Sequence, residues 1–309
     1  MNRSIGTWIA LCFLAALLWH ETAEAKEYKL YFLGGQSNMD GYGYIEELPA
    51  EINQNVAGVY IFHGNTAPDG AAADGRGIWA ELRPGHGAGF KSDGMTNTYS
   101  DRFGVELTFA RRLRELDPES NIAIIKYSRG GTSIDTAAAG NHGCWEIDFE
   151  GGTGAGQGVN QYDHFRATVR QAAALRDIDW DGDLDRLTPA GIVWMQGESD
   201  AYYTEEIACR YQDNLKRLMD QIRVVFGADE MAVVIGRISD SGKDDDGKLW
   251  DHGEIVRDAQ AAFVEADGHA ALVTETDSYG YSDPWHYDTP GYIDLGRRFA
   301  EAMLDLQPQ

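Results

Sequence analysis

Short apolar runs alternate along the chain with longer stretches of helical periodicity. Five runs predict buried strands, because each is apolar, short and followed by polar or turn-forming residues; they lie at 28–33, 122–125, 191–195, 232–238 and 270–274. Helical spacing predicts the helices between them, at 102–116, 162–175, 205–225 and 255–266. Thr289 followed by Pro290 is typical of an N-cap and first turn, and predicts a last helix that ends at Leu306. This alternation indicates an α/β fold with a central, mostly parallel, five-stranded sheet covered on both faces.

One long segment, from Asp40 to Ser100, does not follow this alternation. It is rich in Gly, Ala and Asp and has no sustained periodicity. Long irregular connections inside a compact domain are usually functional loops, and this one directly follows the first predicted strand. We expect it to form one wall of a substrate cleft.

The first predicted strand ends in two glycines and then a serine. The stretch Tyr31-Phe-Leu-Gly-Gly-Gln-Ser37-Asn-Met39 predicts a tight turn that brings Ser37 to the edge of the sheet. Open α/β sheets place their chemistry just beyond the carboxyl ends of their strands. Ser37 could equally cap a helix that begins near Asn38. On this stretch alone, the nucleophile and the helix cap both remain open.

The amino terminus has the pattern of a secretory signal peptide. Arg3 precedes a mostly apolar segment at 8–19, and Ala23-Glu24-Ala25 has the small-x-small pattern of a cleavage site. The prediction is a signal peptide over residues 1–25, cleaved near Ala25, and a single domain over residues 26–309 that is secreted or periplasmic. No later segment reaches the roughly 18 to 20 apolar residues of a spanning helix, so no stable membrane insertion is expected.

The net charge of the chain limits the classes of partner that it can bind. A formal net charge of −24 argues against nucleic acid and against an anionic membrane surface as partners, because phosphate binding needs a basic face.

After loss of the signal peptide two cysteines remain, Cys144 and Cys209, and export would permit them to pair. The sequence is compatible both with a disulfide between them and with two separate thiols. Nothing in the sequence indicates an oligomeric state.

Polar clusters follow four of the five predicted strands and should gather along one edge of the sheet. They contain Ser37, Gly130, Gln196 and His286. A serine nucleophile needs a base, a group that orients the base, and donors where negative charge develops. Asp283 precedes His286 by three residues, close enough to hold the far nitrogen of the imidazole, although such a pair is also common on surfaces. Backbone N–H groups at Gly130 or Gly131 and the Gln196 amide could supply the donors, although each is also ordinary turn chemistry.

Five motifs in this order carry a family resemblance. They are Gly35-Gln-Ser37-Asn-Met39, Phe103-Gly-Val-Glu-Leu-Thr-Phe-Ala110, Gly130-Gly-Thr-Ser133, Val193-Trp-Met-Gln-Gly-Glu-Ser-Asp200 and Asp283-x-x-His286. With them the chain resembles the SGNH (GDSL-type) hydrolase superfamily, and most closely its carbohydrate esterase branch of sialate O-acetylesterase-like proteins and acetylxylan esterases. The resemblance implies a three-layer α/β/α, flavodoxin-like fold. It also implies that Ser37 is the nucleophile, His286 the general base and acid, and Asp283 its orienting carboxylate.

The resemblance further implies an oxyanion hole made by the backbone N–H groups of Ser37 and Gly130 and by the side chain of Gln196. Other superfamily members have asparagine in the third motif, where this chain has Gln-Gly-Glu. We prefer Gln196 to Glu198 there, because a group that stabilises an anion must donate a hydrogen bond. Gly131 remains an alternative to Gly130.

The function implied is that of a serine esterase that removes O-acetyl groups from a carbohydrate, either acetylated xylan or another polysaccharide, or a sialic acid. The acyl transfer runs through an acyl-enzyme and requires no metal or organic cofactor. Two alternatives are a lipase or thioesterase of the same superfamily and a non-catalytic carbohydrate-binding protein on the same fold.

A second feature is an acidic loop ahead of the third strand. Asp177, Asp179, Asp181 and Asp183 stand at alternate positions, with glycine at the turn, as at the start of a calcium loop. Position twelve, normally Glu, is Thr188. This loop has two interpretations: it binds a structural calcium ion, or it is a solvated acidic loop.

Histidines and aromatic residues elsewhere in the chain have plainer interpretations. We expect polar loop contacts rather than zinc ligation for the histidines in loops, because their spacing is not that of metal ligands; these are His63, His86 and His142. Four aromatic residues could stack on sugar rings or pack in the protein; these are Trp79, Tyr99, Trp145 and Trp285.

Overall fold

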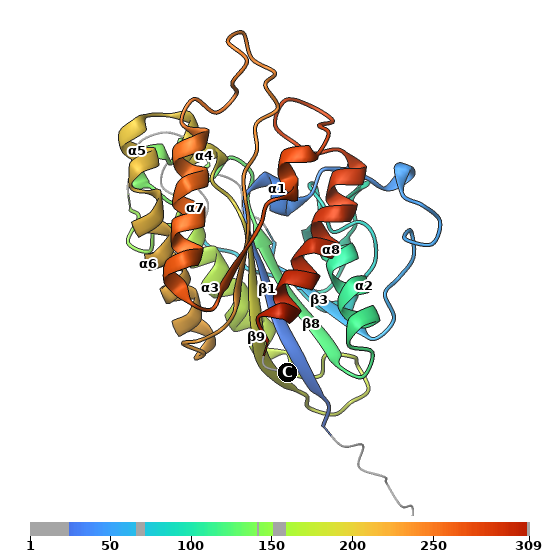
Figure 1. The fold of residues 1–309 in the computed structure, drawn as a ribbon. Helices are drawn as coiled ribbons and strands as arrows, with labels where there is room; N and C mark the ends of the chain where they lie inside the picture. The colour runs from blue at the N-terminus through green and yellow to red at the C-terminus, as the bar shows by residue number, and fades with distance from the viewer. Residues whose placement is uncertain (1–24, 66–71, 141, 151–158, 308–309) are drawn as a thin grey trace, which may run out of the picture.

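A seven-stranded sheet forms the centre of the molecule (Figure 1). The computed structural model describes residues 25–65, 72–140, 142–150 and 159–307, so the predicted signal peptide ahead of Ala25 lies outside the described residues. In spatial order the strands are β11 (Ala270–Val273), β10 (Val233–Gly236), β9 (Arg186–Met195), β1 (Glu27–Gly35), β8 (Asn121–Ser128), β3 (Val59–His63) and β4 (Trp79–Glu81). All neighbours pair in parallel except β3 and β4, which are antiparallel.

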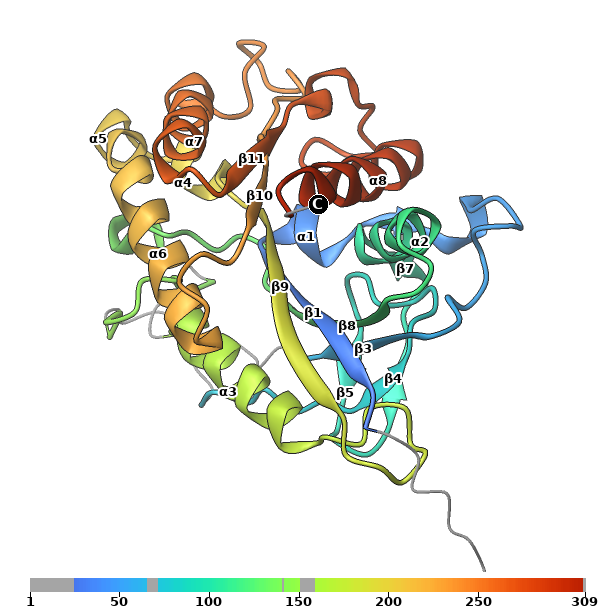
Figure 2. The same ribbon diagram turned by 60° about the horizontal axis from the view of Figure 1, so that its bottom comes forward.

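Helices cover both faces of this sheet, which confirms the predicted three-layer α/β/α arrangement (Figure 2). One face carries α2 (Glu106–Leu116) and α8 (Thr289–Asp305), which pack on each other. The other face carries α3 (Gln161–Ala174), α6 (Tyr211–Phe226) and α7 (Gly253–Asp267). Shorter elements complete the fold: α1 (Ser37–Asp40), α4 (Glu198–Tyr202), α5 (Glu205–Cys209), the pair β2 (Gly43–Tyr44) and β7 (Arg102–Phe103), the pair β5 (Lys91–Ser92) and β6 (Asn97–Thr98), and 3₁₀ turns at Ile45–Glu47, Thr136–Ala138 and Glu275–Ser278.

The burial of β1 explains its continuous apolar sequence. This strand lies between β9 and β8, so helices cover both of its faces. Its side chains from Leu30 to Leu33 are at most 4% exposed. A strand buried on both sides has no solvent face, and therefore it reads as an apolar run rather than as an alternation.

The five predicted strands are all present, but the prediction of a five-stranded sheet is wrong by two. Both additional strands, β3 and β4, come from the segment between Asp40 and Ser100 that we expected to be irregular. The first is a five-residue apolar run isolated among glycine-rich residues, and the second has only three residues. Runs this short give almost no periodic signal, and their conformation depends on pairing, of β3 with β8 and of β4 with β3.

Three helices differ from their predictions in detail. The helix expected over 102–116 begins at Glu106, because Arg102–Phe103 pairs with Gly43–Tyr44 as β7. The helix expected over 205–225 is divided into α5 and α6, with Arg210 between them. At the start of α8, Asp288 rather than Thr289 is the N-cap, and its carboxylate accepts a hydrogen bond of 2.9 Å from the Gly291 amide. Both cysteines are free, Cys144 buried and Cys209 exposed. Within the described ranges, no helix is both long and apolar enough to cross a membrane.

Candidate active site

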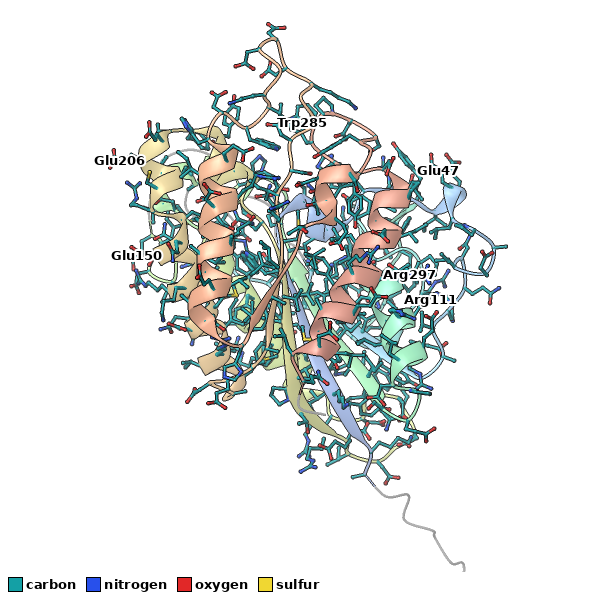
Figure 3. The ribbon with its side chains drawn as sticks, viewed as in Figure 1. Glu47, Arg111, Glu150, Glu206, Trp285 and Arg297 are labelled. Atoms are coloured by element: carbon teal, nitrogen blue, oxygen red, sulfur yellow. The ribbon has the colours of Figure 1, made fainter. Side chains whose placement is uncertain are left out.

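A cavity of about 700 Å³ opens at the carboxyl ends of the strands, the edge that the strand-end clusters predicted. Ser37, Gly130, Gly131 and His286 all line it. Trp285, beside His286, lies at this end of the molecule, above the sheet (Figure 3). Three segments far apart in the sequence therefore meet at one cavity.

Ser37 begins α1 directly after β1 and is 7% exposed. The N-cap of this short helix is Gln36, and no side chain makes a capping hydrogen bond. The structure therefore does not support the helix-cap interpretation of Ser37. Gly35 makes the turn possible, because its φ is +146° and a Cβ there would lie 2.0 Å from the carbonyl oxygen of Met195.

His286 is held from two sides. Its Nδ1 lies 2.7 Å from Oδ2 of Asp283, and the ring of Tyr42 stacks on the imidazole with a centroid distance of 3.6 Å and an interplanar angle of 2°. Burial opposes ionisation of Asp283, but the hydrogen bonds from His286 and from the Trp285 amide outweigh it and hold the pKa of Asp283 below its usual range. An ionised Asp283 accepts the Nδ1 proton and leaves Nε2 as the basic nitrogen.

Asn38 connects the serine to the histidine loop. Its side-chain nitrogen donates to Oε1 of Glu198 at 2.7 Å and to the carbonyl oxygen of Trp285 at 3.2 Å. Its side-chain oxygen accepts from the hydroxyl of Tyr292 at 2.8 Å. One buried amide thus joins α1 to the residue that immediately precedes His286. Among the described residues the Ser37 hydroxyl has no hydrogen-bond partner, so its expected bond to His286 is not formed. Hydrogen bonds between catalytic groups are often long or poorly aligned before a substrate binds.

Gly130 packs against the serine, whereas Gly131 faces His142. A Cβ on Gly130 would lie 3.3 Å from Cβ of Ser37, and a Cβ on Gly131 would lie 2.5 Å from the His142 ring. The Gly130 amide donates to Oδ2 of Asp40 at 3.1 Å, and the other oxygen of this carboxylate accepts from the Ser128 hydroxyl. Burial raises the pKa of Asp40 despite these hydrogen bonds. Of the two glycines, Gly130 has the position required next to the serine.

Gln196 differs from its predicted placement. Its side-chain nitrogen donates to Oδ2 of Asp200 at 2.6 Å and to the carbonyl oxygen of Thr132 at 3.1 Å, and its side-chain oxygen accepts from the Tyr211 hydroxyl at 3.1 Å. The residue is 0% exposed and is not among those that line the cavity. The amide therefore stabilises the interior beneath the site, and the structure does not bring it to the predicted oxyanion position.

This placement makes a prediction for Gln196→Ala. The substitution removes one of the donors to the buried Asp200, which keeps two backbone amides, and it leaves the Thr132 carbonyl without its Gln196 donor, so we expect the free energy of unfolding to fall by about 1–3 kcal/mol. Urea unfolding measures this change, and Gln212→Ala on α6 is the matched control, with an expected change within about 0.5 kcal/mol. A Gln196→Ala protein of unchanged stability whose turnover of an acetate ester fell by roughly two to three powers of ten would restore the oxyanion role.

Two acidic side chains lie buried behind the cavity. Burial raises the pKa of Glu198, whose Oε2 has no hydrogen-bond partner, and it raises the pKa of Asp200 to about 7 against the hydrogen bonds from Gln196 and from two backbone amides. Glu198 accepts the hydrogen bond from Asn38, which joins the start of α4 to α1.

Residues 27–305 match the sequence model of a family described as carbohydrate esterase, sialic acid-specific acetylesterase. The chain belongs to this family. It is therefore a carboxylic ester hydrolase, and the resemblance to the carbohydrate esterase branch of sialate O-acetylesterase-like proteins is confirmed. No match was found among curated protein sequences.

Several solved structures have the same fold as this esterase. A protein from Arabidopsis thaliana matches with a TM-score of 0.58 and 18% identity, over 91% of this chain and 99% of its own. A carbohydrate acetylesterase from Xanthomonas citri matches with a TM-score of 0.61 and 17% identity, over 90% of this chain and 56% of its own. NanS matches with a TM-score of 0.55 and 14% identity, over 92% of this chain and 98% of its own. At these identities the similarity shows the fold alone.

The aromatic residues of the esterase divide into packed and exposed groups. Trp79 and Trp145 are 1% and 0% exposed, and their indole nitrogens donate to Ala172 and Thr132, so they pack in the interior. Tyr99 lies against the His86 ring. Trp285 is 51% exposed and lines the cavity, where further aromatic residues join it: Tyr42, Phe90, Tyr202, Tyr203 and Trp250.

The acidic loop brings together a different set of carboxylates from the one that its spacing predicted. Asp177, Asp179 and Asp185 each offer an oxygen within 4.8 Å of the others, whereas the prediction included Asp181 and Asp183. The Lys26 ammonium hydrogen-bonds to Asp179 and Asp181, which raises the pKa of Lys26. Asp185 replaces the later positions because the Ile178 amide holds its carboxylate under the loop at 2.9 Å.

The Lys26 ammonium would compete with a calcium ion for the carboxylate of Asp179. We therefore expect calcium to raise the melting temperature of Lys26→Met more than that of the wild type, because the variant loses the competing ammonium. Thermal unfolding with calcium and then with EDTA measures the effect, with magnesium as the control ion. Melting temperatures that stay constant in both proteins would leave only the solvated acidic loop.

Asp40, Tyr42 and His63 also line the cavity, so the segment from Asp40 to Ser100 forms part of its wall. That segment was expected to do so, but its irregular sequence did not single out these three residues. Tyr42 reaches His286 across 244 residues of sequence, and such a contact depends on the fold.

Proposed function

We propose that the protein removes O-acetyl groups from a carbohydrate by a Ser-His-Asp acyl-enzyme mechanism. The observation that carries the proposal is the common cavity of Ser37 and His286, with Asp283 hydrogen-bonded to the far nitrogen of the imidazole at 2.7 Å. In the reaction, the Ser37 hydroxyl attacks the ester carbonyl and His286 Nε2 takes its proton. His286 returns this proton to the leaving sugar hydroxyl, and water then hydrolyses the acyl-enzyme. The chemistry requires no metal and no organic cofactor.

Two backbone amides support the developing oxyanion in this proposal. Among the described residues the Ser37 N–H has no hydrogen-bond partner, since it stands at the start of α1. The Gly130 N–H lies beside Ser37, and it would exchange its bond to Asp40 for a stronger bond to the oxyanion. The Ser37 amide can therefore donate to the substrate oxygen from the start, and the Gly130 amide donates to it when negative charge develops there.

Exposed aromatic side chains around the cavity favour a sugar as the alcohol part of the ester. Trp285 is 51%, Tyr202 is 55% and Tyr203 is 44% exposed. Flat aromatic faces pack against the C–H faces of sugar rings, while phenol and indole groups remain free to hydrogen-bond. Acetylated xylan, another acetylated polysaccharide and an acetylated sialic acid are the candidate substrates.

The test is a product screen. Purified protein is incubated with acetylated xylan, other acetylated polysaccharides and acetylated sialosides, and released acetate and deacetylated sugar are measured. We expect release from at least one of these substrates and little turnover of long-chain esters. A preference for long acyl chains would instead indicate a lipase or thioesterase. A failure of Ser37 to react with a serine-directed phosphonate would indicate a non-catalytic carbohydrate-binding protein.

We also propose that the enzyme is secreted or periplasmic, because its N-terminal sequence has the pattern of a signal peptide. Amino-terminal sequencing of the exported protein is expected to start near Lys26. A protein retained in the cytoplasm with its first 25 residues would contradict this.

A further inference from the structure

Two histidines beside the serine have no role in the proposed reaction. His63 is the last residue of β3, is 5% exposed and lines the cavity. His86 lies behind it and is 0% exposed. Their Nδ1 atoms are 3.3 Å apart, so one ring must donate a proton to the other.

Both rings are fixed in place. Phe90 stacks on His63 with a centroid distance of 4.1 Å and on His86 with one of 4.7 Å. The ammonium of Lys126 donates to the backbone oxygen of His86 at 2.8 Å and pairs with Glu106 at 2.7 Å, both of these charged side chains being 0% exposed. The pair of histidines is therefore held by a rigid buried frame.

Each ring carries one proton. Burial, followed by the positive charge of Lys126, lowers the pKa of both histidines well below the ordinary value. Two neutral imidazoles that share one N–H···N hydrogen bond have only two arrangements, and these differ in which ring donates.

The nitrogens on the far side of each ring decide between the two arrangements. His86 Nε2 is buried and has no hydrogen-bond partner. If His63 donated, His86 would carry its proton on this orphaned nitrogen, and buried N–H groups without an acceptor are rarer than buried acceptors without a donor. If His86 donates, its orphaned nitrogen is only an acceptor, and His63 carries its proton on Nε2. Among the described residues nothing hydrogen-bonds to that Nε2, and His63 lines the cavity.

We propose that His63 is a substrate-binding residue that donates its Nε2–H to an oxygen of the sugar part of the substrate. The proposal rests on the proposed function, which places an acetylated carbohydrate in this cavity. Strand β8 lies between β1 and β3, so about 10 Å separates the strand that leads to Ser37 from the strand that ends at His63. The acyl carbonyl at Ser37 is therefore distant from His63, whereas a sugar ring attached to it extends across this gap. A neutral donor suits a hydroxyl or a ring oxygen.

The first experiment reads the protons directly. A long-range ¹H–¹⁵N correlation spectrum of the histidine side chains in the full protein identifies the protonated nitrogen of each ring. We expect His63 to carry its proton on Nε2 and His86 on Nδ1. A His63 ring protonated on Nδ1, or on both nitrogens at neutral pH, would overturn the proposal whatever the enzyme hydrolyses.

The second experiment compares two esters in His63→Phe, which keeps a ring against Phe90 but removes the donor. The probes are the acetylated sugar that the wild type hydrolyses fastest in the product screen and 4-nitrophenyl acetate, which has no sugar. We expect the ratio of kcat/KM for the sugar acetate to kcat/KM for 4-nitrophenyl acetate to fall roughly 3- to 10-fold, mainly through KM. His269→Phe, at the opposite end of the sheet, should leave this ratio at the wild-type value.

His63→Gln keeps an N–H donor and is expected to recover part of the ratio. It also provides a second protein if His63→Phe does not fold. A folded His63 variant with an unchanged ratio would overturn the proposal. If the wild type hydrolyses neither ester, the proposed function fails, and the spectrum still reports the tautomer.

Discussion

Replacing Ser37 with alanine is expected to abolish ester hydrolysis in a protein that remains folded. Without the hydroxyl no acyl-enzyme can form, and the loss of a catalytic nucleophile typically costs roughly 10⁴-fold or more in turnover. The side chain makes no hydrogen bond among the described residues, so its removal leaves no partner unsatisfied there. Hydrolysis of 4-nitrophenyl acetate measures the loss, and circular dichroism verifies the fold.

Ser199 provides the matched control for this experiment. It is a second serine that lines the same cavity, on α4 rather than on α1. Ser199→Ala should retain turnover within a few-fold of the wild type. Retained turnover in Ser37→Ala, or an equal loss in both variants, would contradict the assignment of Ser37 as the nucleophile.

Asp283→Asn is expected to lower kcat by roughly 10³- to 10⁴-fold while the structure is maintained. In the wild type Asp283 accepts the Nδ1 proton of His286 and leaves Nε2 free to act as the base. An asparagine amide can donate to Nδ1 instead, which would place the imidazole proton on Nε2, where the lone pair is needed. The two backbone amides that donate to Asp283 at 2.8 Å can still donate to the asparagine oxygen, so the loop is expected to persist.

Steady-state kinetics with 4-nitrophenyl acetate measure this change, and Asp251→Asn is the control. Asp251 is an exposed aspartate outside the cavity lining, so its substitution removes the same charge without affecting the imidazole. A kcat in Asp283→Asn equal to that of Asp251→Asn would mean that Asp283 does not orient the base. Another carboxylate would then have to be found for that role.

Gln196 illustrates the limit of chemical reasoning from a motif. A side-chain amide is a suitable donor for an oxyanion, and Gln196 follows a strand that ends at the correct edge of the sheet. In the fold, the buried carboxylate of Asp200 and the Thr132 carbonyl take its N–H groups. Removing a hydrogen-bond donor from these two buried acceptors costs more than leaving a cavity wall without a donor, so the Gln196 amide binds the interior partners.

The histidine at the end of β3 illustrates a different limit. His63 and His86 had no metal-ligand spacing, and the sequence analysis expected only polar loop contacts for them. That expectation includes the contact between the two rings, but it does not say which nitrogen of each ring carries the proton. The tautomer depends on every hydrogen-bond partner of both rings. Those partners come from strands and loops that sequence analysis treated as one irregular segment.

The sequence by itself determined the alternation of strands and helices, the edge of the sheet at which the motifs gather, and the family. These features depend on local periodicity and on motif order, which the chain carries without reference to its packing. Only the tertiary structure decided that β3 and β4 join the sheet, that Gln196 turns inward, and that Tyr42 and Asn38 support the histidine loop. Each of these depends on the directions of side chains and on contacts between residues far apart in sequence, and burial assigns such contacts only when the whole chain has folded.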